Sequence, residues 1–388
     1  MTILLSDNIV SALGFTTDEN FRRVRDGVSG LTFFDGQETG VSGPFVASAI
    51  DGAALDEAFY ALPRAAEKRY TRLEKAVILS VADALKGRSI DPSGERVLFI
   101  LSTTKGNVSL LDTAESEGEG CEPGQVYLWR SAELIAGYFG NPNTPLVVSN
   151  ACISGACALI AAQRALQAGR YDCVVVAGAD MLSRFIIAGF QSFKALSQEI
   201  CKPFDARRSG LNLGEAAATL ILAEKPVEAL QAGDVVLTAG AACNDANHIS
   251  GPSRTGEGAY LALKRVLSGV DTGELAFVNA HGTATPYNDE MEAIAIHRAA
   301  LQDVPVTSLK GYFGHTLGCA GVLESIVSTR ALREGTVLKT VGCDTPGVSQ
   351  PLRIAGRTQP VKGRRCINML SGFGGCNAAL LYTLKCRE

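Results

Sequence analysis

The sequence of 388 residues is poor in several features that mark whole classes of protein. It has four scattered histidines and no two cysteines with Cys-x-x-Cys spacing, so we expect no metal site. No apolar run approaches the roughly 18 residues that a membrane-spanning helix needs. The N-terminus lacks a charged segment followed by an apolar core, so we expect no signal peptide. These absences argue against metalloproteins, membrane proteins and exported proteins.

An excess of charge of one sign is also missing. The chain carries 36 lysines and arginines against 40 aspartates and glutamates. No basic stripe with interleaved aromatic residues appears, so nucleic acid is not an expected partner. Eleven cysteines without framework spacing favour a reducing compartment. We therefore expect a cytoplasmic protein.

Small and apolar residues, in contrast, are abundant. The chain is 46% hydrophobic and has 41 glycines, which is typical of closely packed α/β layers. Short β-branched runs predict buried strands, and longer periodic segments predict helices. The predicted strands are residues 97–101, 146–148, 173–177, 216–222, 235–240, 276–278, 304–308, 365–369 and 378–384. The predicted helices are residues 65–85, 131–138, 155–166, 258–267, 289–300 and 320–332.

A surface turn at residues 224–233 separates two stretches with a similar plan. Each contains a strand, a turn of small residues and a helix, at Cys152 in the first and at residues 310–324 in the second. Such similarity indicates an internal duplication. We therefore predict two units, residues 1–230 and 231–388. Residues 113–124 are expected to form an exposed acidic loop, and residues 185–195 an irregular apolar segment.

A cysteine lies between strand and helix in the stretch PLVVSNACISGACALIAAQRAL, residues 145–166. The free N–H groups and the positive dipole end of the predicted helix would stabilise a thiolate at Cys152. Thiol pKa values at such positions fall to roughly 3.5–7.5. Most free cysteines are inert apolar residues, and the chain has ten others. Its position makes Cys152 the candidate nucleophile.

Three loops of the second unit carry polar side chains after apolar strands. They are FVNAHGTATP with His281, SLKGYFGH with Lys310 and His315, and LSGFGGCN with Phe373. Taken singly, the histidine is more often a structural residue, by about two to one, the lysine is ordinarily a surface residue, and a tight hairpin also explains the glycines. Together with Cys152 they indicate one catalytic site. The other two histidines, His248 and His297, are not expected to take part.

Four motifs, NACISG, AHGTATPYND, SLKGYFGHTLGCAGVLES and GFGGCNA, resemble those of the β-ketoacyl–acyl carrier protein synthases in order and rough spacing. KPFDARRSGLNLGEAAATLILAE extends the resemblance over nearly the whole chain. It implies a thiolase-like α/β fold of two pseudo-duplicated halves in five αβαβα layers, and an obligate dimer. It also implies decarboxylative Claisen condensation, in which malonyl-acyl carrier protein extends a cysteine-bound acyl chain by two carbons. The substrates would be carried on the 4'-phosphopantetheine arm of acyl carrier protein, with no other cofactor.

The same resemblance implies a role for each matching residue. Cys152 would be the acyl-accepting nucleophile, and His281 and His315 the catalytic histidines. Lys310 and Glu324 match the supporting lysine and glutamate of the family.

Further matches concern substrate binding. Thr283 and Thr285 match threonines that hold the pantetheine arm. Phe373 matches a gating phenylalanine, whose N–H would share the oxyanion hole with the N–H of Cys152. Ser371 stands where an aromatic residue normally flanks the acyl pocket. This departure favours a specialised polyene or polyketide pathway over ordinary fatty acid synthesis.

Alternative assignments stay open at this point. A coenzyme A-dependent thiolase or starter synthase is disfavoured by His315, although Cys376 lies near the position of the second thiolase cysteine. A chain-length-factor subunit lacks the nucleophile, so Cys152 argues against that assignment. The chain can instead be the active half of a heterodimer with such a subunit.

The carrier proteins of this pathway class are acidic, so a basic docking patch is expected. The candidates are Lys68, Arg69 and Arg72 at the start of a predicted helix, with Arg207 and Arg208 in the loop before GLNLGE. An ordinary solvated surface explains the same charges equally well.

Overall fold

The predicted apolar runs form an eleven-stranded sheet in a computed structural model that describes residues 1–36, 41, 43–112 and 121–386. The strand order is β13-β11-β10-β15-β16-β9-β1-β8-β6-β4-β5. The first half supplies β1 (Thr2–Ser11), β4 (Val97–Ser102), β5 (Leu146–Val148), β6 (Cys173–Asp180) and β8 (Ala216–Glu224). The second half supplies β9 (Val235–Asn244), β10 (Leu275–Asn279), β11 (Pro305–Thr307), β13 (Arg353–Ile354), β15 (Arg365–Gly372) and β16 (Cys376–Leu384).

The two halves of this sheet repeat one plan. The short β13 is left out of this comparison, and the five strands of each half are numbered by their order in the chain. Read from the outer edge of the sheet inward, both halves then have the strand order third, second, fourth, fifth and first. The third, second and fourth strands are parallel neighbours, and the remaining pairs are antiparallel in both halves. The halves join at β1 and β9 through one residue pair, Ile3 and Val236. The predicted duplication is therefore present in the topology, while a division into units at residue 230 stays a prediction.

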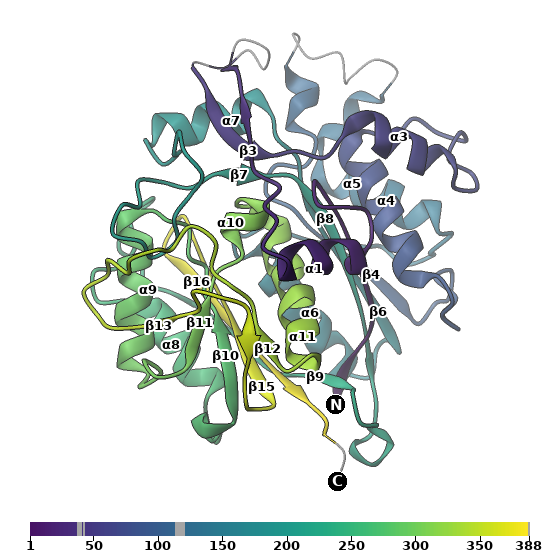
Figure 1. Ribbon diagram of the computed structural model, residues 1–388. Coiled ribbons are helices and arrows are strands. Elements are labelled where there is room, and N and C mark those ends of the chain that lie inside the picture. Colours follow the sequence, from purple (N-terminus) through teal and green to yellow (C-terminus); the bar gives the residue numbers. More distant parts are fainter. Residues whose placement is uncertain (37–40, 42, 113–120, 387–388) are drawn as a thin grey trace.

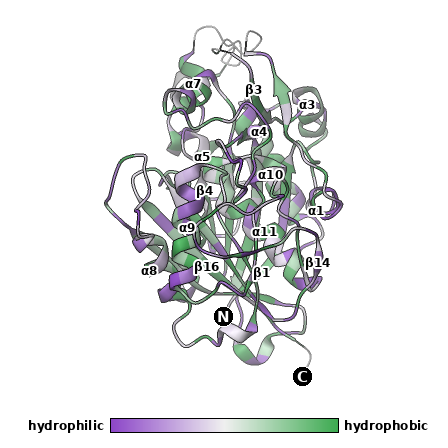
Figure 2. Cartoon of the chain, turned by 60° about the vertical axis from the view of Figure 1, so that its left-hand side comes forward, coloured by the Kyte–Doolittle hydropathy of each residue, from purple (hydrophilic) through white to green (hydrophobic). Residues whose placement is uncertain are grey.

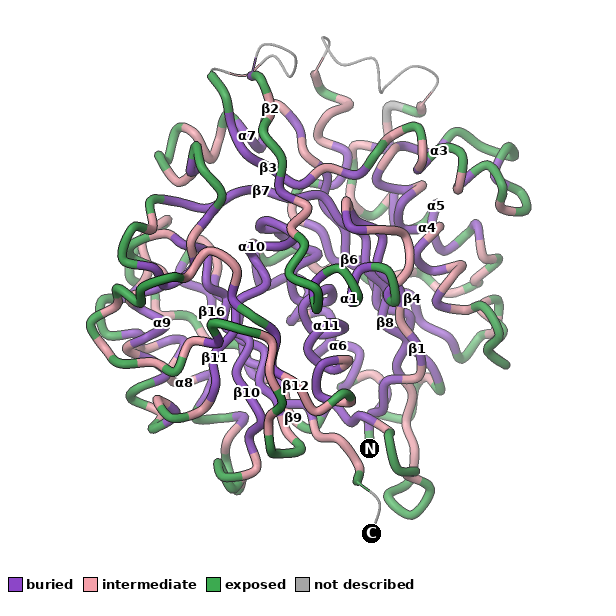
Figure 3. Tube along the Cα trace, viewed as in Figure 1, coloured by how far each residue is buried: buried purple, intermediate pink, exposed green. Residues whose placement is uncertain are grey.

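Helices complete the five layers (Figure 1). The central layer consists of α6 (Ser154–Gln167) and α11 (Ala320–Arg333), which lie between the two halves of the sheet and are buried almost throughout (Figure 3). One outer layer consists of α4 (Arg72–Leu85) and α5 (Leu128–Tyr138), which pack on the first half. The other consists of α8 (Glu257–Val266) and α9 (Pro286–Arg298) beside the second half.

The remaining elements lie around this framework. The further helices are α1 (Thr17–Arg25), α3 (Gly52–Tyr60), α7 (Arg184–Ser192) and α10 (Lys310–Phe313), and the 3-10 turns are η1 (Val108–Leu111), η3 (Pro123–Val126), η4 (Val227–Ala229), η5 (Thr272–Glu274) and η6 (Leu317–Cys319). The small sheets are formed by β2 (Thr32–Phe34), β3 (Phe45–Ser48) and β7 (Leu213–Gly214), and by β12 (Thr336–Val337) with β14 (Gln359–Pro360). Among the described helices, none has the length and apolarity needed to cross a bilayer.

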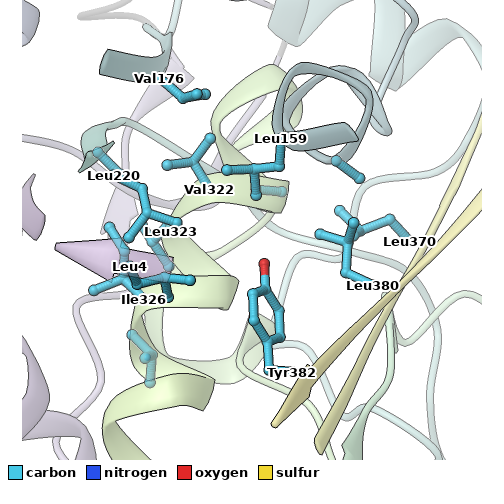
Figure 4. Packing of buried hydrophobic residues seen from close by; sticks show 14 of the residues in the cluster. Leu4, Leu159, Val176, Leu220, Val322, Leu323, Ile326, Leu370, Leu380 and Tyr382 are labelled. Atoms are coloured by element: carbon cyan, nitrogen blue, oxygen red, sulfur yellow. The ribbon is translucent and has the colours of Figure 1, made fainter. Parts of the chain in front are cut away.

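The main core lies where the central helices meet both halves of the sheet. Leu159 of α6 and Val322 of α11 pack there with Leu220 and Leu380 (Figure 4). Figure 2 accordingly shows hydrophobic colours along many of the central strands and helices, whereas outer segments such as α1 and α8 carry more hydrophilic colour. Burial of such side chains is the main source of stability in a fold of this kind.

The two central helices cross at a pair of glycines. A Cβ atom on Gly155 would lie 2.8 Å from the backbone N of Val322, and one on Gly321 would lie 2.3 Å from the backbone N of Ala156. Real Cβ atoms do not come this close to backbone atoms. Glycine is therefore required where α6 and α11 cross, directly behind the turns that lead into both helices.

Three predictions about elements were wrong. β5 is not a buried strand: it lies at the end of the sheet, and Leu146 is 46% exposed. The predicted helix at residues 65–85 begins only at Arg72, because Thr71 caps it and Glu74 completes a capping box. The predicted irregular segment at residues 185–195 contains α7, capped by Ser183. Residues 113–120 of the predicted acidic loop lie outside the described residues.

Candidate active site

Cys152 lies in a tight turn between β5 and α6. The preceding residue, Ala151, has a φ of 44°, in the left-handed region that non-glycine residues rarely adopt. The Ser154 hydroxyl stabilises the turn: it accepts from the backbone N of Asn150 at 2.8 Å and donates to the carbonyl of Ala151 at 2.6 Å. The turn holds Cys152 at the start of α6, with 7% of its surface exposed.

The resting thiol has the opposite pKa shift to the one predicted. Burial, and next the neighbouring Cys376, raise the pKa of Cys152 to about 12, while Lys310 and a hydrogen bond from the Phe373 N–H lower it. Desolvation therefore outweighs the helix N-terminus in this closed site. Cys152 rests as a protonated thiol.

The GFGG segment joins β15 to β16 and lies against the cysteine turn. A Cβ atom on Gly372 would lie 3.0 Å from the backbone N of Cys152 and 2.9 Å from Sγ of Cys376. The next residue, Phe373, is half-buried, and its ring packs against Phe190 and Phe193 with centroid distances of 5.5 and 5.4 Å. The glycine thus brings the Phe373 N–H beside the thiol.

His281 follows β10 in a loop that is fixed by a buried carboxylate. Glu292 of α9 accepts the backbone N–H groups of His281 and Gly282, both at 2.7 Å. Further along the loop, the hydroxyls of Thr283 and Thr285 are 3.0 Å apart. Sequence reasoning missed this carboxylate, although an acidic residue in the early turns of a predicted helix was a usable signal.

The two predicted histidines face each other. The rings of His281 and His315 are 4.9 Å apart and nearly perpendicular, at 88°. Neither ring nitrogen of His315 has a hydrogen-bond partner among the described residues. Burial and the charge of Lys310 hold the pKa of both histidines well below the ordinary value, so both imidazoles are neutral.

Lys310 and Glu324 form a buried ion pair behind the histidines. The lysine Nζ also lies 3.5 Å from Nδ1 of His281. On the other side of the pair, Glu324 accepts the side-chain amide of Asn279 at 3.2 Å. The lysine charge is thereby held next to His281, where it disfavours imidazolium.

A cavity of roughly 480 Å³ connects these groups to the surface. Seven predicted site residues line it: Cys152, His281, Thr283, Thr285, His315, Ser371 and Phe373. Lys310 and Glu324, which were also predicted, lie behind the lining of the cavity and are not part of it. The Ser371 hydroxyl donates to the Asn377 side chain at 2.8 Å, so it is already engaged.

Other lining residues were not predicted. Lys194 lies at the cavity rim with an exposed side chain, and Tyr287 is 78% exposed there. His248, which was expected to lie outside the site, also lines the cavity, and its Nδ1 accepts the N–H groups of Ser250 and Gly251 at 3.2 and 3.1 Å. The loop after β9 brings it there, a placement that strand and turn signals do not specify.

The predicted docking residues near α4 divide into two kinds. Lys68 and Arg69 are exposed and precede the helix. Arg72 instead points inward, with an ion pair of 2.7 Å to the buried carboxylate of Glu215.

The other two docking candidates, Arg207 and Arg208, also differ in exposure. Arg207 is exposed and pairs with Asp344 at 2.9 Å. Arg208 is largely buried and donates to the carbonyls of Gly347 at 2.7 Å and Pro286 at 3.3 Å. Its guanidinium therefore braces two loops.

Within the described residues, no three histidine, cysteine, aspartate or glutamate side chains are arranged to hold a metal ion. The sequence matches the Beta-ketoacyl synthase family over its N-terminal domain at residues 7–227 and its C-terminal domain at residues 234–344. The chain belongs to the β-ketoacyl synthase family. The predicted family resemblance is thereby confirmed.

Two relatives of this β-ketoacyl synthase are named for the carrier protein. The chain is 34% identical over 263 residues to the mitochondrial 3-oxoacyl-[acyl-carrier-protein] synthase of Arabidopsis thaliana, covering 63% of this chain and 57% of the relative. It is 35% identical over 262 residues to 3-oxoacyl-[acyl-carrier-protein] synthase 2 of Rhizobium meliloti (strain 1021), covering 62% and 60%. The matched stretch thus spans less than two thirds of either relative.

Solved structures match over almost the whole chain. A ketosynthase (ApeO) in complex with its chain length factor (ApeC) from Xenorhabdus doucetiae has a TM-score of 0.83 and 25% identity, covering 99% of this chain and 98% of that chain. The ishigamide ketosynthase/chain length factor has a TM-score of 0.85 and 25% identity, covering 99% of both chains. These likenesses confirm the predicted thiolase-like fold class.

Proposed function

We propose that this β-ketoacyl synthase catalyses decarboxylative condensation of a cysteine-bound acyl group with malonyl-acyl carrier protein. The observation that carries the proposal is one cavity lined by a thiol and two neutral histidines, Cys152, His281 and His315. A thiol accepts acyl groups from thioesters, and neutral imidazoles donate N–H groups to a developing oxyanion.

In the first half-reaction, Cys152 attacks the acyl thioester and the carrier thiol leaves. The attacking thiol is protonated, so its proton is transferred to the departing carrier sulfur as the new C–S bond forms, and the carrier leaves as a thiol. The negative oxygen of the tetrahedral intermediate lies in the oxyanion hole formed by the N–H groups of Cys152 and Phe373. One such donor is typically worth about 3–4 kcal/mol to the transition state.

In the second half-reaction, the malonyl thioester loses carbon dioxide and becomes an enolate. His281 and His315 stabilise the enolate oxygen as N–H donors, and the charge of Lys310 keeps them unprotonated. The enolate carbon then attacks the acyl-cysteine, forming the new C–C bond and releasing the Cys152 sulfur. The product is a β-ketoacyl thioester two carbons longer.

The test is incubation with acyl- and malonyl-acyl carrier protein, followed by mass spectrometry of the carrier. A β-ketoacyl product and an acyl group mapped to Cys152 are expected. Labelling of Cys157, Cys319 or Cys376 with Cys152 unmodified contradicts the assignment. Product formed only from coenzyme A thioesters favours the thiolase or starter-synthase alternative.

We further propose that acyl carrier protein delivers both substrates on its 4'-phosphopantetheine arm, with no other cofactor. Thr283 and Thr285 face the cavity where the arm would enter. The exposed cations Lys68, Arg69 and Arg207 attract the acidic carrier, and Lys194 is a further exposed cation at the cavity rim. Arg72 contributes through its ion pair with Glu215, and Arg208 through the two loops that it braces.

Charge reversal tests this docking surface. Lys68→Glu with Arg69→Glu should raise the KM for acyl carrier protein and flatten its salt dependence, because steering by exposed charges is screened by salt. Turnover of a small pantetheine thioester should not change, since it does not touch the patch. Equal losses with both substrates contradict docking at these residues.

We propose that a second subunit covers the exposed β5 edge, as an identical chain or as a chain length factor. β5 ends the sheet, and at the start of α5, which packs beside β5, Tyr127 and Trp129 are 58% and 56% exposed. Such an unpaired edge beside exposed apolar side chains favours association. The named ketosynthase–chain length factor complexes and the presence of Cys152 favour this chain as the active subunit.

Native mass spectrometry, alone and after co-expression with a candidate partner, distinguishes the two assemblies. A homodimer without the partner supports self-association, and a 1:1 complex supports the heterodimer. A monomer under both conditions contradicts the proposal. We retain the prediction of a cytoplasmic location.

A further inference from the structure

A buried carboxylate that the mechanism above does not use lies at the end of β6. β6 is the fourth strand of the first half, and its counterpart, β15, ends at Gly372 beside the thiol. Asp180 ends β6 and is 1% exposed. The repeated topology thus brings Asp180 to the same edge of the fold as the catalytic loops.

Asp180 accepts hydrogen bonds from two separate segments. Its Oδ1 accepts the hydroxyl of Thr103 at 2.9 Å and the N–H of Thr104 at 3.1 Å, in the loop after β4. Its Oδ2 accepts the N–H of Gly318 at 2.7 Å, in the turn before α11. The carboxylate therefore bridges a loop of the first half to a turn of the second.

The bonding pattern indicates an ionised carboxylate. Among the described residues, its hydrogen-bond partners are N–H and O–H groups, without a lysine or arginine side chain. The Thr103 hydroxyl accepts the N–H of Gly106 at 3.1 Å, so its own proton is directed to Asp180. Burial raises the pKa of Asp180 above its ordinary value, and hydrogen bonds led by that from Gly318 oppose the shift. Both oxygens accept hydrogen bonds, which favours the ionised form.

The turn held by Asp180 directly follows His315. Within it, Leu317 has a φ of 50°, in the left-handed region. The next residue, Gly318, is hydrogen-bonded to the first half through both of its backbone polar groups. Its N–H donates to Asp180, and its carbonyl accepts the Ser102 hydroxyl at 3.0 Å. A Cβ atom on Gly318 would lie 2.8 Å from Oδ2 of Asp180. This strained turn thus depends on contacts from the other half.

We propose that Asp180 is a positioning residue: it holds the His315 turn, whose Leu317 lies in the same buried apolar cluster as Cys152, and thereby keeps a negative charge near the thiol. The inference deepens the proposed function and rests on it for the role of His315. The charge of Asp180 also raises the pKa of the Cys152 thiol, by less than burial and Cys376 do. Asp180 therefore links the acyl-accepting half to the decarboxylating half.

The test compares Asp180→Asn with a matched control, Glu74→Gln. Glu74 is also a fully buried carboxylate with neutral donors, Thr71 N–H at 2.9 Å, Asn107 Nδ2 at 3.0 Å and Gln125 Nε2 at 2.8 Å, but it lies in α4. Each variant is measured for carbon dioxide release from malonyl-acyl carrier protein, for acyl transfer to Cys152, and for iodoacetamide alkylation of each cysteine.

Asp180→Asn should slow carbon dioxide release by roughly 10- to 100-fold, since small misplacements of catalytic groups have effects of this size. Acyl transfer should fall much less. Alkylation of Cys152 should become faster while that of Cys376 stays unchanged, because only the charge near Cys152 has been removed. Ser102→Ala should show a weaker loss of carbon dioxide release, and Glu74→Gln none per folded molecule.

Equal losses of carbon dioxide release and acyl transfer, or equal acceleration of Cys152 and Cys376, would indicate general loosening and overturn the proposal. Parental rates in Asp180→Asn would overturn it as well. If the unmodified protein releases no carbon dioxide, the proposed function fails, and the alkylation comparison still decides whether Asp180 acts on Cys152.

Discussion

The two halves of this protein share a topology and differ in chemistry. The third strand of the first half, β5, leads into the turn with Cys152, whereas its counterpart β11 leads into the segment with Lys310 and His315. After the second strands, the loop of the first half holds Thr103 and that of the second half holds His281. One strand order therefore brings equivalent loops to one edge of the fold, and their side chains decide what each half does.

The comparison suggests a division of labour. In the proposed mechanism, the first half contributes the acyl acceptor, and the second half contributes the neutral histidines and the Phe373 N–H. The halves are held together by α6 and α11 in the central layer and by Asp180 beside the site. Changes at the joint, by which we mean the crossing of α6 and α11, should disable both half-reactions, whereas changes within one half should affect mainly its own.

Breaking the joint should have the largest effect. Gly321→Val places side-chain atoms where even a Cβ lies 2.3 Å from the Ala156 N, so the central helices cannot stay in contact. We expect a loss of more than about 3 kcal/mol in unfolding free energy, measured by denaturant titration. Gly189→Ala is the control, because a Cβ there meets nothing within 4 Å. Unchanged stability of Gly321→Val would contradict the close crossing.

Removing the buried cation should affect the second half more than the first. Lys310→Met leaves the Glu324 carboxylate buried without its partner, which typically costs about 3–5 kcal/mol. Adding Glu324→Gln should recover part of that loss, as measured in a double-mutant cycle by urea unfolding. If the two single losses simply add, the ion pair is not the source of the effect.

The smallest expected effect concerns only the Cys152 thiol of the first half and is seen in the pH dependence of its alkylation. Since burial raises the pKa of Cys152 to about 12, its thiolate fraction is small at neutral pH and rises about tenfold for each pH unit. Alkylation of Cys152 by iodoacetamide should therefore keep accelerating from pH 7 to pH 10. A plateau near pH 7 would show that the helix N-terminus dominates after all.

Much of the fold was predictable because strand runs and small-residue turns are local signals. The bounds of β5 were predicted as observed, but its exposure was not, since apolar sequence does not distinguish a central strand from an edge strand. The start of α4 was missed although Thr71 and Glu74 form a capping box. Among the motif residues that line the cavity, Cys152, His281 and His315 were predicted, whereas Tyr287 was not.

What sequence reasoning missed depends on distant segments. Glu292 acts through backbone N–H groups of another loop, and Asp180 through a turn 138 residues further along the chain. The pKa of Cys152 was predicted in the wrong direction, because its burial in a cluster with the distant Ile186 and Leu317 is not visible in the local sequence. Local patterns located Cys152, His281 and His315 in the cavity, whereas Glu292 and Asp180, which bond to other segments, required the structure.

The division of labour is tested most directly by measuring both half-reactions in Cys152→Ala and His315→Ala. Acyl transfer is followed by intact mass after incubation with acyl-acyl carrier protein, and decarboxylation by carbon dioxide release from malonyl-acyl carrier protein. We expect Cys152→Ala to lose acylation yet still release carbon dioxide, and His315→Ala to lose carbon dioxide release yet still accept the acyl group. Decarboxylation at the parental rate in His315→Ala, or persistent acylation of Cys152→Ala, would contradict the account.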